Sequence, residues 1–141
     1  MKTTEEMFAE YSKECLRLQK ILNLLNWSMY FELRKLNDSV AQCEANSAGC
    51  VATLVLNADG GKTPINPKEC ASHEMWHLFL WRIQEMISKK MTKIEKKELD
   101  QEIERLVCVL EKLKIVEEPV LDHTKDVEGG KVTKKSIKKI K

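Results

Sequence analysis

The sequence predicts a small α+β domain, and three observations support this fold class. Apolar residues recur at helical spacing in residues 4–25, 67–89 and 92–114. Two stretches, 27–36 and 50–57, instead alternate apolar and polar residues or are rich in β-branched ones, which is typical of strands. With 141 residues, the chain is long enough for one domain with a single hydrophobic core.

The first helix is expected from Thr4 to Leu25. Thr3 followed by Glu6 forms a capping-box pattern, in which each side chain binds the other residue's backbone N–H. The apolar residues then lie along one face of the helix, at Met7, Tyr11, Cys15, Leu18, Ile21, Leu22 and Leu25. This face should pack on another apolar surface.

Two strands and a short third one should follow. Trp27, Met29, Phe31 and Leu33 alternate with polar side chains, so one face of that strand should be buried. The segment 50–57, "CVATLVLN", reads as a more fully buried strand. Between them, residues 40–49 can supply a further short strand and a turn at "ANSAG", which would form a hairpin with the buried strand.

Two helices joined by a very short turn complete the predicted domain. Asn66 is a suitable N-cap, Pro67 fits the first turn, and the helix should extend to about Lys89. Thr92 with Glu95 starts the next helix, whose apolar stripe consists of Leu99, Ile103, Leu106, Leu110 and Leu113. Because the turn is short, the two helices should be antiparallel neighbours.

Composition narrows the cellular setting. The longest apolar runs fall far short of the roughly 20 residues needed to span a bilayer, which argues against a membrane protein. The acidic N-terminal residues do not fit a signal peptide, and five scattered cysteines without a CxxC pair do not indicate a disulfide framework. We therefore expect a protein of the reducing cytoplasm.

The charge of the chain is uneven. Residues 131–141 carry six lysines and no acid, so the net charge of +2 hides a value of −4 for the first 130 residues. We expect residues 117–141 to be a flexible lysine-rich tail after a single domain at 1–116. The tail can attract nucleic acid, but it has neither arginine nor an aromatic residue to stack on bases, so this indication is weak.

The segment "CASHEMWHLFLW", residues 70–81, contains the chemistry. On a helix, His73 and His77 project from the same face one turn apart, so both rings can bind one metal ion. Glu74 would lie beside this ion and could accept a proton from a bound water molecule. Packing of the two histidines in a metal-free core is the alternative, but a glutamate buried there would be costly without a cation or a catalytic role.

This HExxH segment and the order of the elements around it resemble the zincin metallopeptidases. The chain is most similar to minimal single-domain metallopeptidases of bacteria and phages, over about residues 27–113, although only the HExxH segment is specific. The resemblance implies a zinc ion held by His73 and His77, with Glu74 as the general base. It also implies that the strand at 50–57 borders the cleft and binds an extended peptide or protein substrate.

A third zinc ligand is expected, because catalytic zinc normally has three protein ligands. The extended motif HExxHxxGxxH is absent, since Leu80 and Ile83 occupy the positions of its glycine and last histidine. Antiparallel pairing about a turn near Met91 places the height of His77 near residue 105 of the next helix and that of His73 near 109.

Three residues of this helix lie at suitable heights. Glu104 flanks the apolar stripe and is our first choice, which would make the site similar to that of the gluzincins. Glu102 and Cys108 are the alternatives. The function expected is a zinc-dependent metallopeptidase; the alternative is a non-proteolytic metal-binding interaction or regulatory protein, such as a phage-encoded one, on the same scaffold. The substrate and the oligomeric state are left open.

Overall fold

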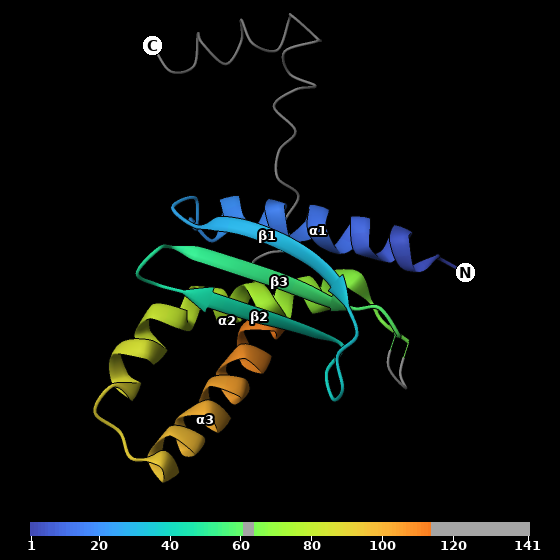
Figure 1. Ribbon diagram of the computed structural model, residues 1–141. Helices are drawn as coiled ribbons and strands as arrows, with labels where there is room; N and C mark the ends of the chain where they lie inside the picture. The colour runs from blue at the N-terminus through green and yellow to red at the C-terminus, as the bar shows by residue number, and fades with distance from the viewer. Residues whose placement is uncertain (61–63, 114–141) are drawn as a thin grey trace, which may run out of the picture.

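A computed structural model describes residues 1–60 and 64–113 and contains one three-stranded sheet and three helices in these ranges (Figure 1). The elements, in chain order, are α1 (Thr4–Ile21), β1 (Ser28–Arg34), β2 (Ala41–Asn46), β3 (Val51–Asn57), α2 (Pro67–Ser88) and α3 (Lys93–Lys112). The predicted α+β class is therefore confirmed. The predicted tail at 117–141, and the last residues of the predicted domain at 114–116, lie outside the described residues.

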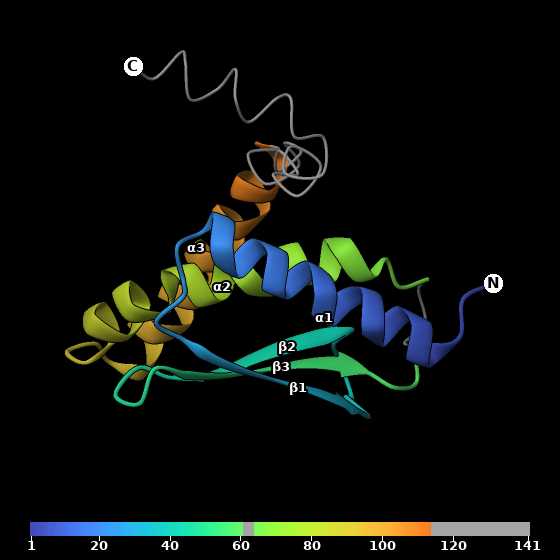
Figure 2. The same cartoon turned by 90° about the horizontal axis from the view of Figure 1, so that it is seen from above.

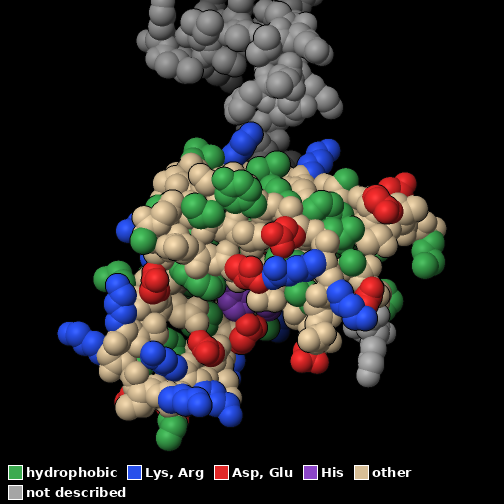
Figure 3. All heavy atoms as spheres, in the orientation of Figure 1, with side chains coloured by type: hydrophobic (Ala, Val, Ile, Leu, Met, Phe, Trp, Pro, Cys, Tyr) green, Lys and Arg blue, Asp and Glu red, His purple; other side chains and the backbone are tan. Residues whose placement is uncertain are grey.

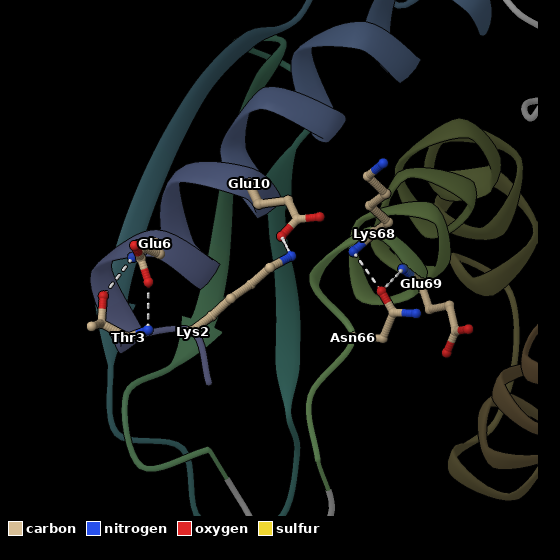
Figure 4. A network of polar contacts seen from close by, with 7 residues as sticks. All are labelled: Lys2, Thr3, Glu6, Glu10, Asn66, Lys68 and Glu69. Carbon is tan, nitrogen blue, oxygen red and sulfur yellow. Dashed lines mark hydrogen bonds and ion pairs between the residues drawn. The ribbon is translucent and has the colours of Figure 1, made fainter.

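Helix α1 begins where the sequence predicts and ends earlier. The Thr3–Glu6 capping box is present, and Lys2 pairs with Glu10 one turn into the helix (Figure 4). The helix ends before Asn23, which has a left-handed conformation with φ of 54°. The backbone N–H of Leu24 binds the carbonyl of Gln19, and that of Asn23 binds the carbonyl of Lys20, which is a Schellman arrangement. The predicted end at Leu25 was wrong, and the Leu25 side chain is 65% exposed.

The sheet has the order β1-β3-β2, so β3 is its central strand. Strand β1 pairs with β3 in parallel, from Ser28 opposite Val51 to Arg34 opposite Asn57. Strands β2 and β3 form the predicted antiparallel hairpin, with Ala41 opposite Leu56. Because both edges of β3 are paired, the expectation that this strand binds substrate by strand addition was wrong. Only β1 and β2 have an edge to offer.

Helices α1 and α2 lie side by side on one face of the sheet, and α3 lies beyond α2 (Figure 2). Between the helices and the sheet is one core of buried side chains. Its largest fully buried members are Tyr11, Leu18, Leu54, Leu56, Met75 and Leu78. Burial alternates along the edge strand β1, whereas the central strand β3 is buried from Leu54 to Asn57. Helix α2, which contains the HExxH segment, therefore packs directly on one face of the sheet.

The caps of α2 and α3 follow the sequence closely. The Asn66 side chain accepts hydrogen bonds from the backbone N–H groups of Lys68 and Glu69 (Figure 4). Thr92 and Glu95 form the predicted capping box at the start of α3. Since only four residues separate the two helices, they pack against each other as neighbours.

The buried stripe of α3 differs from the prediction at Val107, which is buried, and at Leu106 and Leu113, which are exposed. Ile103 and Val107 are buried against α2, whereas Leu106 is 42% exposed. Val107 lies four residues after Ile103, whereas Leu106 lies three residues after it, so α3 packs on α2 through its i, i+4 row of side chains.

None of the described helices combines the length and the apolar character that crossing a membrane requires.

Candidate metal centre

The two histidines of the HExxH segment face the same point. Helix α2 is fixed at its start by the Asn66 cap and held against the sheet by its buried face, so the positions of His73 and His77 follow from helical geometry. Their Nε2 atoms lie 3.1 Å apart and their ring centroids 4.8 Å apart. Both side chains are only partly buried. The rings are therefore neither turned away from each other nor enclosed in the core.

Glu104 on α3 completes a group of three. Its Oε1 lies 2.8 Å from Nε2 of His77, and its Oε2 lies 3.4 Å from Nε2 of His73. Each of the three residues offers one ligand atom, and these atoms all lie within 4.8 Å of one another. The group combines two ligands from one helix with one from its antiparallel neighbour.

The spacing of these atoms is suited to a tetrahedral metal ion. Bonds of about 2.0–2.1 Å at tetrahedral angles place ligand atoms about 3.3 Å from one another. The two Nε2 atoms lie 3.1 Å apart, and each has a different carboxylate oxygen of Glu104 nearby, Oε1 at 2.8 Å from His77 and Oε2 at 3.4 Å from His73. Two imidazoles and a carboxylate are also a donor set that zinc favours, and they leave a fourth position free. The group is thus a candidate metal site.

The alternatives for the third ligand lie elsewhere on α3. Glu102 forms an ion pair with Arg105 at 2.5 Å, and both side chains are exposed. Cys108 is exposed and does not belong to the group. Of the three residues singled out by the sequence, the structure brings only Glu104 to the histidines.

Glu74 is buried beside this group, with 7% of its surface exposed. Burial raises the pKa of its carboxyl to about 7; the positive field of a protonated His73 opposes the shift, and the nearby Glu104 carboxylate adds to it. The backbone N–H of Cys43 on β2 favours the ionised form. No lysine or arginine of the described residues pairs with Glu74. A carboxyl with a pKa near neutrality is suited to accept and return a proton.

The site lies in a hollow between the edge of the sheet and α3. Figure 3 shows the histidine side chains at the bottom of this hollow, with acidic side chains around its opening. Strand β2 forms the wall of the hollow on the side of the sheet, since it is the strand that packs most closely on α2.

Burial lowers the pKa of His77, while the Glu104 carboxylate opposes this shift. The net pKa is lowered, so the ring favours its neutral form, in which imidazole binds metals.

A cavity of about 240 Å³ lies between α2 and α3 nearer the turn that joins them, and none of the three candidate ligands lines it. Trp81, one turn after His77, and Asp100, one turn before Glu104, are among its lining residues. The side-chain amide of Gln84 donates a hydrogen bond of 2.7 Å to Asp100 and so joins the two helices here.

Glu111 is a further residue at the site that the sequence did not predict. One of its carboxylate oxygens lies 3.3 Å from Nδ1 of His73, on the side of the ring away from Glu104. The available signal was its spacing, because Glu111 follows Glu104 by seven residues and so projects from the same face of α3. The height of His73 was predicted near residue 109 of α3, about half a helical turn before Glu111, so Glu111 was not among the candidates.

No known protein family, curated protein or solved structure matches this chain. The fold and the site therefore define the class of protein on their own. It is an α+β protein in which an HExxH helix and its antiparallel neighbour form a His-His-Glu group able to hold a metal ion.

Proposed function

We propose that this protein is a zinc-dependent metallopeptidase related to the gluzincin-like members of the zincins. One observation carries the proposal: the ligand atoms of His73, His77 and Glu104 converge, and the buried Glu74 is the next residue after the first of them. A packed core histidine pair would need neither the converging glutamate nor a second, unpaired carboxyl.

The three converging residues would hold the metal, and Glu74 would move the proton. A bound zinc ion supplies Lewis acidity, which polarises a water molecule and a substrate carbonyl. Glu74 lies beside the ligands without belonging to the group, so it can accept the proton of the attacking water. Its pKa of about 7 also allows it to return this proton to the amine that leaves.

The free edge of β2 is the suitable place for a peptide. Val40 binds β3 through its carbonyl, so the backbone groups of Ala41, Cys43 and Ala45 point away from β3. The Cys43 N–H lies close enough to Glu74 to influence its pKa, so this edge borders the proposed base. An extended substrate bound along β2 would therefore present its backbone to Glu74.

The variant Glu74→Gln tests the proposal. It should bind zinc as the parent protein does and should no longer cleave an unfolded protein substrate or a peptide library. A matched control is Glu98→Gln, which changes an exposed glutamate of α3 outside the site. Equal cleavage by Glu74→Gln and the parent would refute the assigned base, and a zinc-loaded parent without any turnover would refute the peptidase proposal.

The second candidate is a metal-binding protein without proteolytic activity. The observation that favours it is the small size of the described part of the chain, in which the sheet has three strands and the cavity of about 240 Å³ is lined by none of the three candidate ligands. Bound zinc without turnover, in the experiment above, would support this candidate. Attraction of nucleic acid by the lysines at 131–141 stays a separate proposal, because those residues lie outside the described ranges.

A further inference from the structure

The two histidines of the candidate metal site are held in different ways. Both Nε2 atoms face Glu104 and each other. Behind the rings, Nδ1 of His73 faces a carboxylate oxygen of Glu111 at 3.3 Å. For Nδ1 of His77, the described residues supply no such partner.

Glu111 itself has a single partner in the described part of the chain, and this partner is His73. The Glu111 side chain is 27% exposed, against 55% for Glu104, so it is the more buried of the two carboxylates. A half-buried carboxylate without a lysine or arginine is costly, and a hydrogen bond from an imidazole N–H offsets this cost.

The direction of this contact determines the chemistry of the ring. A neutral imidazole has one N–H donor and one acceptor nitrogen. If Nδ1–H of His73 donates to Glu111, the proton is on Nδ1 and the lone pair is on Nε2, which points at Glu104 and His77. A carboxylate behind a metal-binding imidazole also fixes the orientation of the ring, which keeps Nε2 directed at the metal.

We propose that Glu111 is a positioning residue of the metal site, which fixes the tautomer and the orientation of His73 through Nδ1. Helix α3 then supplies both the third ligand and the support of the first one, from positions seven residues apart on one face. This inference rests on the metal-binding part of the proposed function and not on peptide cleavage.

Zinc affinity of the full chain, measured by competition with a chromophoric chelator, tests the inference. Glu111→Ala should weaken zinc binding about 10- to 100-fold, and Glu111→Gln, whose amide oxygen still accepts a hydrogen bond, should fall between this variant and the parent. Glu102→Ala is the matched control on the same helix and should bind zinc like the parent, because Glu102 pairs only with Arg105.

A second readout separates positioning from a general loss of structure. In nitrogen-15 NMR spectra of the zinc-loaded parent, His73 should carry its proton on Nδ1 and exchange it slowly. In Glu111→Ala this exchange should become faster, whereas the signals of His77 should be unchanged. If Glu111→Ala does not fold, as judged by circular dichroism of the metal-free protein, Glu111→Gln provides the same comparison.

Unchanged zinc affinity in a folded Glu111 variant, or a change at His77 in place of His73, would overturn the inference and leave the metal site intact. The variant His73→Ala distinguishes the two failures. If it retains zinc, the metal site itself is wrong and the role of Glu111 with it.

Discussion

Replacing Glu74 by glutamine should stabilise the metal-free protein above neutral pH. Burial raises the pKa of Glu74 from 4.5 to about 7, so the folded state binds this proton more tightly than the unfolded state does. The stability that protonation contributes is fully present below pH 4.5 and is lost as the pH rises through about 7. At higher pH the folded protein contains a buried carboxylate, and the shift corresponds to about 3 kcal/mol.

Glutamine has a similar shape and no charge to bury. Its NH2 group loses part of its hydration, which offsets about 1 kcal/mol of the gain. We therefore expect Glu74→Gln to raise the free energy of unfolding by about 2 kcal/mol at about pH 8, and to lower it by up to about 1 kcal/mol at pH 4.5, where only the hydration loss of the amide remains. The two values differ because the parent carboxyl is already neutral in the folded protein at the lower pH.

Urea unfolding of both proteins at the two pH values, with a chelator present, measures this difference. Glu98→Gln serves as the control for a change of net charge and should show no gain at either pH. A variant no more stable than the parent at about pH 8, or equally stabilised at both pH values, would refute the conclusion that Glu74 is buried as described. A confirmed gain would show that this carboxyl is retained at a cost in stability, as expected of a catalytic group.

Three further predictions concern the site and the core. Glu104→Gln should weaken zinc binding at least tenfold in a chelator competition, because it removes the charged third ligand; Glu102→Gln should leave it unchanged. Burial lowers the pKa of His77, so protons compete for its ring only on acidification; zinc should be released as the pH falls, and a zinc content that does not change in a pH titration would contradict the site. Val107→Ala should lower the free energy of unfolding by about 2 kcal/mol and Leu106→Ala by less than about 1 kcal/mol, and equal losses in urea unfolding would contradict the assigned burial.

Local patterns predicted the parts of the fold that depend on neighbouring residues. The capping boxes at Thr3 and Thr92 and the Asn66 cap are present because each needs only three or four consecutive residues. The early end of α1 was missed because the left-handed conformation of Asn23 competes with an apolar pattern that continues to Leu25. An apolar residue favours a helix, but a turn residue can end it.

Features that depend on residues far apart in the sequence were harder to predict. The sequence indicated the β2–β3 hairpin, but whether β1 joins on the side of β2 or of β3 depends on pairing across the whole sheet. Glu104 was found by counting residues from the turn between α2 and α3. The same count missed Glu111, because an error of two residues in the pairing of two helices is about 3 Å, enough to exclude a residue that reaches the site by its side chain.

The metal content of the purified protein tests the central claim most directly. Elemental analysis of the chain, produced in zinc-containing medium, should find one zinc ion per molecule, and His77→Ala should contain almost none while keeping the circular dichroism spectrum of the parent. A parent protein without stoichiometric metal, or a His77→Ala variant that retains it, would contradict the claim that His73, His77 and Glu104 form a metal site.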